Sequence, residues 1–271
     1  MSNLIIRTLT GSLFVVLILG SILLGYWAFF SVMLGFSAIA LNEFYRMSPK
    51  GLQVQALNGI FILILIQLVL GFVTEGLLDS KYLLIIIVAV VGLFIFELYR
   101  KKEKPFENIA WTILGLVLIA FPFSILSNIF HFDHQNNTGA YLLIAIFSIT
   151  WMNDTGAYLV GTAIGKHRLF ERISPKKSWE GSIGGAVVAI LTAYLFSIWI
   201  TQIDLIHWVI IAIIITIFAN FGDLVESLLK RSSNVKDSGS ILPGHGGVLD
   251  RFDATLFAAP LVWVYIMLFL G

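Results

Sequence analysis

The chain has 271 residues, of which 58% are hydrophobic and only 12% charged, and its mean hydropathy is +0.93. Soluble domains carry roughly 25% charged residues, so this composition excludes a soluble globular protein and predicts an integral membrane protein. The absence of Cys excludes disulfides, thiolate metal sites and a Cys nucleophile, whereas the net charge of +1 excludes nothing.

Long apolar runs recur along the whole chain. A helix needs about 20 apolar residues to cross the bilayer core, and a membrane strand would alternate polar and apolar residues instead. We therefore predict an all-α, polytopic transmembrane bundle of about nine spans, which forms a single integral membrane domain over residues 1–271. The first run is interpreted as an uncleaved first helix, and Gly25 predicts a tight hairpin after it. The predicted spans are residues 8–24, 26–44, 56–74, 81–99, 109–130, 139–160, 183–202, 207–229 and 254–270.

The basic residues predict the orientation of these spans. With a cytoplasmic N-terminus and an outer C-terminus, 16 of the 17 Lys and Arg residues fall on the cytoplasmic side, and only Lys81 falls outside. Cytoplasmic loops are expected to be basic, so we predict this orientation and a location in the cell (plasma or inner) membrane. His131 and His134 then lie on the outer side, where no two-His metal site is expected.

Polar residues in and after the sixth span form a first constellation. Asp154 lies within the span, where a carboxylate should face the protein interior or a wet cavity. Lys176, Lys177 and Ser178 follow in the next cytoplasmic loop and could bind phosphate. Topology alone also requires a basic loop there, so both interpretations of the lysines stay open.

A second constellation ends the eighth span. From Asp223, offsets of 3, 4, 7 and 8 place further polar residues on one helix face: Glu226, Ser227, Lys230 and Arg231. Asp223 and Glu226 can share a cation, and the two basic residues lie closer to water. The alternative is a set of local pairs, such as Glu226 with Lys230, which stabilise a helix by a few tenths of a kcal/mol.

A third constellation precedes the ninth span. Pro and clustered Gly at 243–247 break helical structure and allow unusual backbone angles around His245. Asp250 and Asp253 then begin the span, with Arg251 between them. Helix capping explains one of these carboxylates but leaves the other, the Arg and the His without a role. Carboxylates with basic groups and a Gly-rich turn indicate phosphate chemistry at a membrane.

These segments resemble a known family. Residues 227–253 read Ser-x-Leu-Lys-Arg-x4-Lys-Asp-x-Gly-x2-Leu-Pro-x-His-Gly-Gly-Val-x-Asp-Arg-Phe-Asp. This motif, together with residues 153–158 and 174–181, is similar to segments of the phosphatidate cytidylyltransferases, also called CDP-diacylglycerol synthases. The resemblance implies that CTP and phosphatidate give CDP-diacylglycerol and pyrophosphate in phospholipid biosynthesis, with Mg²⁺ as cofactor and a homodimer as the assembly. CTP-using lipid kinases share part of the motif, so the acceptor is implied rather than determined.

The catalytic part is expected mainly within residues 150–254, on the cytoplasmic face. Phosphoryl transfer needs metal and cationic groups that neutralise the phosphates. The expected metal ligands are Asp223, Asp250, Asp154, Glu226 and Asp253. The expected catalytic residues are Asp223, Asp250, Lys230, Arg231 and His245. The expected substrate-binding residues are Lys176, Lys177, Ser178, Ser227, Lys236, Asp237, Gly246, Gly247 and Arg251.

Other functions are less well indicated. A transporter or channel is the main alternative, because Asp154, Asp223 and the broken Gly-Pro segment could line an ion path, but the two halves of the chain are not similar. A phosphatidyltransferase that consumes CDP-diacylglycerol would need an Asp-Gly pair, which is absent. The basic residues follow the membrane topology, so no nucleic-acid partner is expected. The expected partners are CTP, phosphatidate and membrane lipids.

Overall fold

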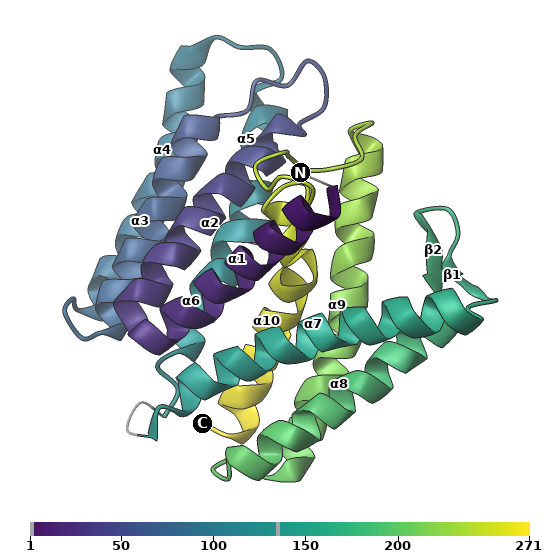
Figure 1. Ribbon diagram of the computed structural model, residues 1–271. Helices are drawn as coiled ribbons and strands as arrows, with labels where there is room; N and C mark the ends of the chain where they lie inside the picture. The colour runs from purple at the N-terminus through teal and green to yellow at the C-terminus, as the bar shows by residue number, and fades with distance from the viewer. Residues whose placement is uncertain (1–2, 134–135) are drawn as a thin grey trace. The chain divides into compact units, whose positions relative to one another are not determined.

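The computed structural model describes residues 3–133 and 136–271, which are mostly helical (Figure 1). His134 is not among these residues. The expectation about the two outer histidines, His131 and His134, therefore lies partly outside the described structure. In chain order the elements are α1 (Asn3–Leu24), α2 (Tyr26–Arg46), α3 (Ala56–Thr74), the 3₁₀ helix η1 (Ser80–Leu84), α4 (Ile85–Arg100), α5 (Pro105–Gly115), the π-helical turn η2 (Leu116–Ala120), α6 (Phe121–Ile129), α7 (Thr138–Ile164), β1 (Arg168–Phe170), β2 (Ser174–Ser178), α8 (Trp179–Trp199), α9 (Leu205–Ser232) and α10 (Leu249–Phe269).

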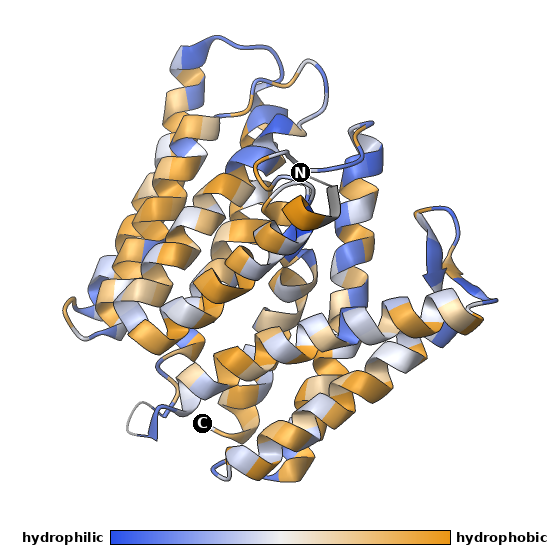
Figure 2. Cartoon of the chain, viewed as in Figure 1, coloured by the Kyte–Doolittle hydropathy of each residue, from blue (hydrophilic) through white to orange (hydrophobic). Residues whose placement is uncertain are grey.

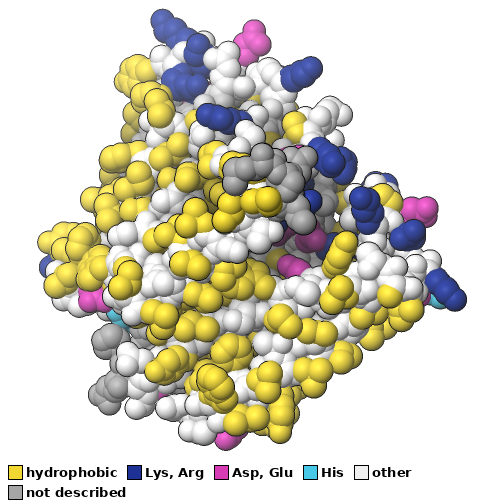
Figure 3. All heavy atoms as spheres, in the orientation of Figure 1, with side chains coloured by type: hydrophobic (Ala, Val, Ile, Leu, Met, Phe, Trp, Pro, Cys, Tyr) yellow, Lys and Arg dark blue, Asp and Glu magenta, His cyan; other side chains and the backbone are white. Residues whose placement is uncertain are grey.

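Nine helical stretches among the described residues are long and apolar enough to cross a membrane, and each overlaps one of the predicted spans. The fifth stretch runs without interruption through α5, η2 and α6. Figure 2 shows apolar residues along α3 and α4 and hydrophilic residues at their ends. Apolar side chains also cover much of the visible surface over α1 and α8, as expected where lipid replaces water (Figure 3). The predicted all-α polytopic bundle is therefore confirmed, whereas its orientation stays a prediction.

The chain folds into two compact units. The first comprises residues 1–128 and 232–251, and the second comprises residues 129–231 and 252–271. Each unit combines two separate stretches of the sequence, so the division does not produce two consecutive domains. The single membrane domain expected from the sequence stays a prediction.

In the first unit, α2 packs against α1, α3 and α5. Gly25 alone joins α1 to α2, and its φ of +107° lies in a region that only glycine adopts without strain. The predicted tight hairpin is thus confirmed.

A buried polar network ties α4 to α5 and to the loop before α3. Glu97 on α4 accepts hydrogen bonds from Gln55 Nε2 at 2.6 Å, Arg100 Nη1 at 2.7 Å and Asn108 Nδ2 at 2.9 Å. Its side chain is only 2% exposed, so these donors compensate the cost of removing a carboxylate from water.

In the second unit, α7 and α8 pack closely along their length. Small residues at every fourth position of α8 are buried: Gly181, Gly185, Ala189 and Ala193. A Cβ at Gly185 would lie only 2.7 Å from the backbone oxygen of Asn153 on α7. This spacing of small residues is typical of helices that approach closely within a membrane. The antiparallel hairpin β1–β2, which the sequence did not predict, connects the two helices.

Candidate active site

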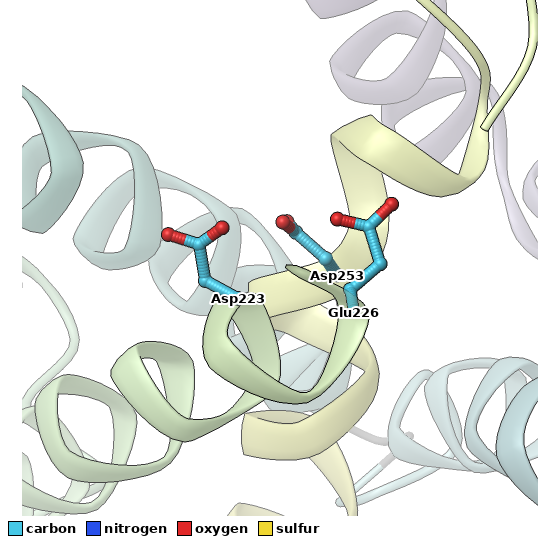
Figure 4. Close-up of side chains that lie close together, drawn as sticks. All are labelled: Asp223, Glu226 and Asp253. Carbon is cyan, nitrogen blue, oxygen red and sulfur yellow. The ribbon is translucent and has the colours of Figure 1, made fainter. Parts of the chain in front are cut away.

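Three carboxylates lie together in the second unit: Asp223 and Glu226 on α9, and Asp253 on α10. We call them the carboxylate cluster. One oxygen from each lies within 4.8 Å of the others. Figure 4 shows the three side chains extending toward a common space from the two helices. The helical spacing of Asp223 and Glu226 that the sequence predicted is confirmed, and Asp253 joins them from a different helix.

Two lysines pair with this cluster. Lys177, on β2, forms an ion pair with Asp223, and Lys230 Nζ lies 2.8 Å from Glu226 Oε2. The local helical pair of Glu226 with Lys230 is thus present, and the roles of both residues in the site stay predictions. Three carboxylates and two ammonium groups leave one negative charge in excess. Like charges at this separation favour a bound proton or cation, and carboxylate oxygens are the ligands that hard divalent cations prefer.

The loop and hairpin residues before α8 have different environments. Ser178 is buried and caps α8 by accepting a hydrogen bond from the Gly181 N–H at 3.1 Å. Lys176 is exposed, whereas Lys177 is half-buried at the carboxylate cluster. The two lysines, which the sequence could not distinguish, therefore differ in their contacts.

The other predicted residues of this unit lie around these elements. Ser227 is half-buried on α9, and Arg231 is exposed in its last turn. Asp154 is exposed on α7, where it accepts a hydrogen bond from Asn153 Nδ2 at 3.3 Å. Asp154 is not among the carboxylates of the cluster, and its role as a metal ligand stays a prediction.

The first unit contains the segment 236–251, which we call the signature loop. Within it, Asp250 Oδ2 accepts hydrogen bonds from Ser238 N at 3.0 Å, Ser238 Oγ at 3.0 Å and Gly247 N at 2.8 Å. Asp250 thus fixes the conformation of the loop. Its predicted role as a metal ligand is untested by this geometry and stays a prediction.

Gly246 adopts a φ of +81°, and a Cβ at this position would lie 2.6 Å from Asp250 Oδ2. Both the backbone angle and the close approach therefore require glycine here. Lys236 and Asp237 are exposed, while Gly247 is buried. The signature loop thus presents charged side chains on a backbone that buried polar groups hold in place.

Basic groups surround His245 in the same unit. Arg251 Nε donates to the His245 carbonyl oxygen at 3.1 Å. Arg7, from α1, approaches the same turn: a Cβ at Gly244 would lie 2.7 Å from Arg7 Cγ. Burial, Arg251 and Arg7 together lower the pKa of His245 below its ordinary value. The positive charges of Arg251 and Arg7 would stabilise an anion bound beside His245.

Two residues beside the signature loop, Arg7 and Glu43, were not predicted from the sequence as part of the site. Arg7 lies 229 positions before the start of the loop in the chain, and the sequence indicated only its contribution to the membrane topology. Glu43 lies within α2 and is 2% exposed, with the loop's backbone as its partner. A carboxylate inside a predicted span was the available signal for Glu43, because the same rule singled out Asp154.

Known proteins match the chain over almost its full length. The cytidylyltransferase family matches residues 5–269, which include the carboxylate cluster and the signature loop. The chain is 35% identical to a phosphatidate cytidylyltransferase of Bacillus subtilis (strain 168), with 97% of each chain covered. It is 33% identical to a protein of the same name from Staphylococcus saprophyticus, covering 95% of this chain and 96% of the relative. A phosphatidate cytidylyltransferase of Haemophilus influenzae is 30% identical over 74% of this chain and 75% of its own.

Proposed function

Because the chain belongs to the cytidylyltransferase family, we propose that it transfers the cytidylyl group of CTP to phosphatidate in phospholipid synthesis. The products are CDP-diacylglycerol and pyrophosphate. The observation that carries this proposal is the carboxylate cluster with its two lysines. It occurs in a chain that matches a phosphatidate cytidylyltransferase over 97% of its length.

The reaction is a displacement at the α-phosphorus of CTP. A phosphate oxygen of phosphatidate forms the new bond, and the bond from the α-phosphorus to the bridging oxygen of the β-phosphate breaks. The nucleophile is already an anion, so neither a covalent enzyme intermediate nor an activating base is required. The difficulty is to bring two polyanions together and to stabilise the charge that develops in the transition state.

The donor set of the carboxylate cluster fits a hard divalent cation such as Mg²⁺. Its three oxygens are close enough to be shared, and its excess negative charge needs compensation. Asp223, Glu226 and Asp253 would hold the ion, which when bound would neutralise phosphate charge. Asp154 and Asp250 stay as further predicted ligands.

The basic groups would hold the phosphates. A lysine ammonium has three N–H donors, so Lys177 and Lys230 can each pair with a carboxylate and still donate to a phosphate oxygen. Arg231 and Arg251 are exposed and offer two parallel donors each. Further contacts are proposed for Lys176, Ser178, Ser227, Lys236, Asp237, His245, Gly246 and Gly247.

The location of the reaction follows from the substrates. Phosphatidate is a membrane lipid and CTP is soluble, so the site is proposed to open on the cytoplasmic face of the plasma membrane. The nine long apolar helical stretches found in the described part of the chain make it a multi-pass membrane protein. The homodimer that the resemblance implies stays a prediction.

The proposal is tested by measuring pyrophosphate release from CTP by purified protein in lipid nanodiscs. Release is expected only when both phosphatidate and Mg²⁺ are present, and diacylglycerol should not replace phosphatidate. The control is Asp223→Asn in the same nanodiscs. Release that is independent of phosphatidate, or no release under any condition, would contradict the proposal and would favour the transporter alternative.

A further inference from the structure

We propose that Glu43 is a positioning residue for the transfer reaction, which holds the signature loop in its working conformation from α2. The inference rests on the proposed function, because the loop carries residues assigned to the substrates. Glu43 lies inside a membrane-spanning helix and is 2% exposed. A buried carboxylate is costly unless several donors satisfy its oxygens, so its partners indicate its role.

All the hydrogen-bond donors to Glu43 that the described structure records come from the signature loop. Glu43 Oε1 accepts from the Val248 N–H at 3.1 Å, and Oε2 accepts from the Leu249 N–H at 2.9 Å. Ser238 Oγ lies 3.2 Å from Oε2. These contacts join residues separated by about 200 positions in the chain.

Two of these donors are backbone groups at the start of α10. Such N–H groups have no partner within their own helix, and a negative charge near them is favoured by the helix dipole. Glu43 therefore acts as a cap that α2 supplies to α10. The start of α10 also carries Asp250 and Arg251, so this cap fixes the position of both.

Ser238 connects Glu43 to Asp250. Its Oγ lies 3.2 Å from Glu43 Oε2 and 3.0 Å from Asp250 Oδ2. Asp250 in turn accepts from the Gly247 N–H. The contacts thus form one chain from α2 through Ser238 to the glycine turn that follows His245.

The close approach of Glu43 also explains two glycines of the loop. A Cβ at Gly239 would meet Glu43 Oε1, and a Cβ at Gly247 would meet both Glu43 Oε2 and Ser238 Oγ. Neither residue has a positive φ, so packing against the carboxylate is the reason for glycine there. Before α10 begins at Leu249, the loop has only one short bridge, Leu242 with Gly246, as regular structure. Its order therefore depends on these polar contacts.

A purely structural carboxylate offers a matched control. Glu97 is also buried in a membrane-spanning helix and also has three hydrogen-bonding partners, Gln55, Arg100 and Asn108. None of these partners belongs to the signature loop. Glu97→Gln should therefore reduce stability without a specific effect on the loop, whereas Glu43→Gln should affect the loop itself.

The experiment compares Glu43→Gln, Glu43→Asp and Glu97→Gln in nanodiscs. Amide hydrogen exchange at Val248 and Leu249 and kcat/KM for CTP are measured together with the melting temperature. Glutamine keeps one acceptor oxygen and replaces the other with a donor, so one loop N–H loses its acceptor. We expect faster exchange at Val248 and Leu249 and a loss of kcat/KM of about 10–100-fold, as for other supporting residues around reacting groups. Glu43→Asp, which keeps the charge, should recover part of the activity.

Glu97→Gln should leave kcat/KM of the folded protein and exchange in the loop unchanged. The positioning role is overturned if Glu43→Gln leaves both quantities at the wild-type level, or if both Gln variants lose activity in proportion to their melting temperatures. If Glu43→Gln does not fold, Ser238→Ala takes its place: faster loop exchange with reduced kcat/KM supports the role, and wild-type values overturn it. A wild-type protein without phosphatidate-dependent pyrophosphate release would instead overturn the proposed function, because the exchange measurement does not depend on turnover.

Discussion

Buried acidic side chains in the membrane-spanning helices are each compensated in a different way. Glu97 has two amides and an Arg, Glu226 has Lys230, and Glu43 has backbone N–H groups. A carboxylate in such a helix is stable only when other groups compensate its charge. Glu226 also belongs to the carboxylate cluster, which as a whole differs from Glu97 and Glu43, because its three acids share two lysines. Its uncompensated charge makes the cluster, rather than the buried acids in general, the candidate metal site.

The carboxylate cluster yields the first prediction. Asp223→Asn and Asp253→Asn keep the side-chain size but remove the charge that a hard cation needs. Each variant should insert into the membrane and lose roughly two orders of magnitude or more in rate, because metal stabilisation of transferring phosphate is worth several kcal/mol. Activity is measured against Mg²⁺ concentration, with Asp79→Asn in an exposed loop as control. A variant with the wild-type rate and the same Mg²⁺ midpoint would show that its residue is not a ligand.

His245 yields the second prediction. Burial, Arg251 and Arg7 lower its pKa below the ordinary value of 6.5, so it should be neutral at pH 7. Between the lowered pKa and the ordinary one, the unfolded chain binds the proton more readily than the folded chain. The contribution of His245 to stability is therefore present above pH 6.5 and is lost as the pH falls through that window.

The measurement is an NMR titration of the histidines in substrate-free protein, with His245→Gln to assign the signal. Arg251→Gln should move the pKa of His245 upward, toward the ordinary value, because it removes one of the neighbouring positive charges. A wild-type pKa of His245 at or above the ordinary value would contradict this description of the site.

At the scale of secondary-structure elements, the hairpin between α7 and α8 connects the basic loop to α9. Lys177 on β2 reaches Asp223, and Ser178 at the end of the same strand caps α8. The strand therefore places one lysine at the carboxylate cluster and its neighbour, Lys176, in solvent. Two adjacent lysines with similar chemistry but different contacts offer a direct comparison.

The third prediction uses this pair. Lys177→Ala should reduce kcat/KM at least tenfold, because it removes a positive charge from the cluster where the phosphates are proposed to bind. Lys176→Ala should have a smaller effect, since its side chain is exposed. The stability of both variants should change little, because partly exposed ion pairs contribute only about 0–1 kcal/mol. The measurement is steady-state kinetics of both variants together with their melting temperatures. Equal losses of kcat/KM in the two variants would contradict the assignment of Lys177, rather than Lys176, to the carboxylate cluster.

The features that could be predicted from the sequence are those that depend on residues close together in the chain. The spans follow from the length of apolar helix that a bilayer requires, and the pairing of Glu226 with Lys230 follows from helical spacing. Glu43 with Val248 and Lys177 with Asp223 could not be predicted, because these contacts join positions far apart in the chain. Several tertiary arrangements of the same helices are compatible with the sequence, and local patterns do not distinguish them. The same limit left Asp154 and Asp253 as further possible ligands, and within the described residues the structure groups Asp253 with Asp223 and Glu226.

At the scale of the whole molecule, the distribution of basic residues among the membrane spans predicts a protein that works at one face of the bilayer. The basic residues divide 16 to 1 between the two sides when the N-terminus is cytoplasmic. The carboxylate cluster and the signature loop belong to different compact units, which α9 and α10 join through the continuous chain. Both lie in segments that this orientation assigns to the cytoplasmic side.

The fourth prediction tests the orientation. The chain has no Cys, so single substitutions can be labelled without background. In sealed cells, an impermeant maleimide should label Asn136→Cys, and it should label Lys102→Cys only after permeabilisation. Labelling of both from outside would contradict the nine-span arrangement with a cytoplasmic N-terminus.

The most direct test of the proposed chemistry follows the individual phosphates of CTP. Purified protein in nanodiscs with phosphatidate and Mg²⁺ is given CTP labelled with ³²P at either the α or the γ position. Cytidylyl transfer predicts that the α label enters the lipid product and that the γ label leaves as pyrophosphate. Entry of the γ label into lipid would identify a CTP-dependent lipid kinase instead, and the absence of either label from lipid would contradict transfer altogether.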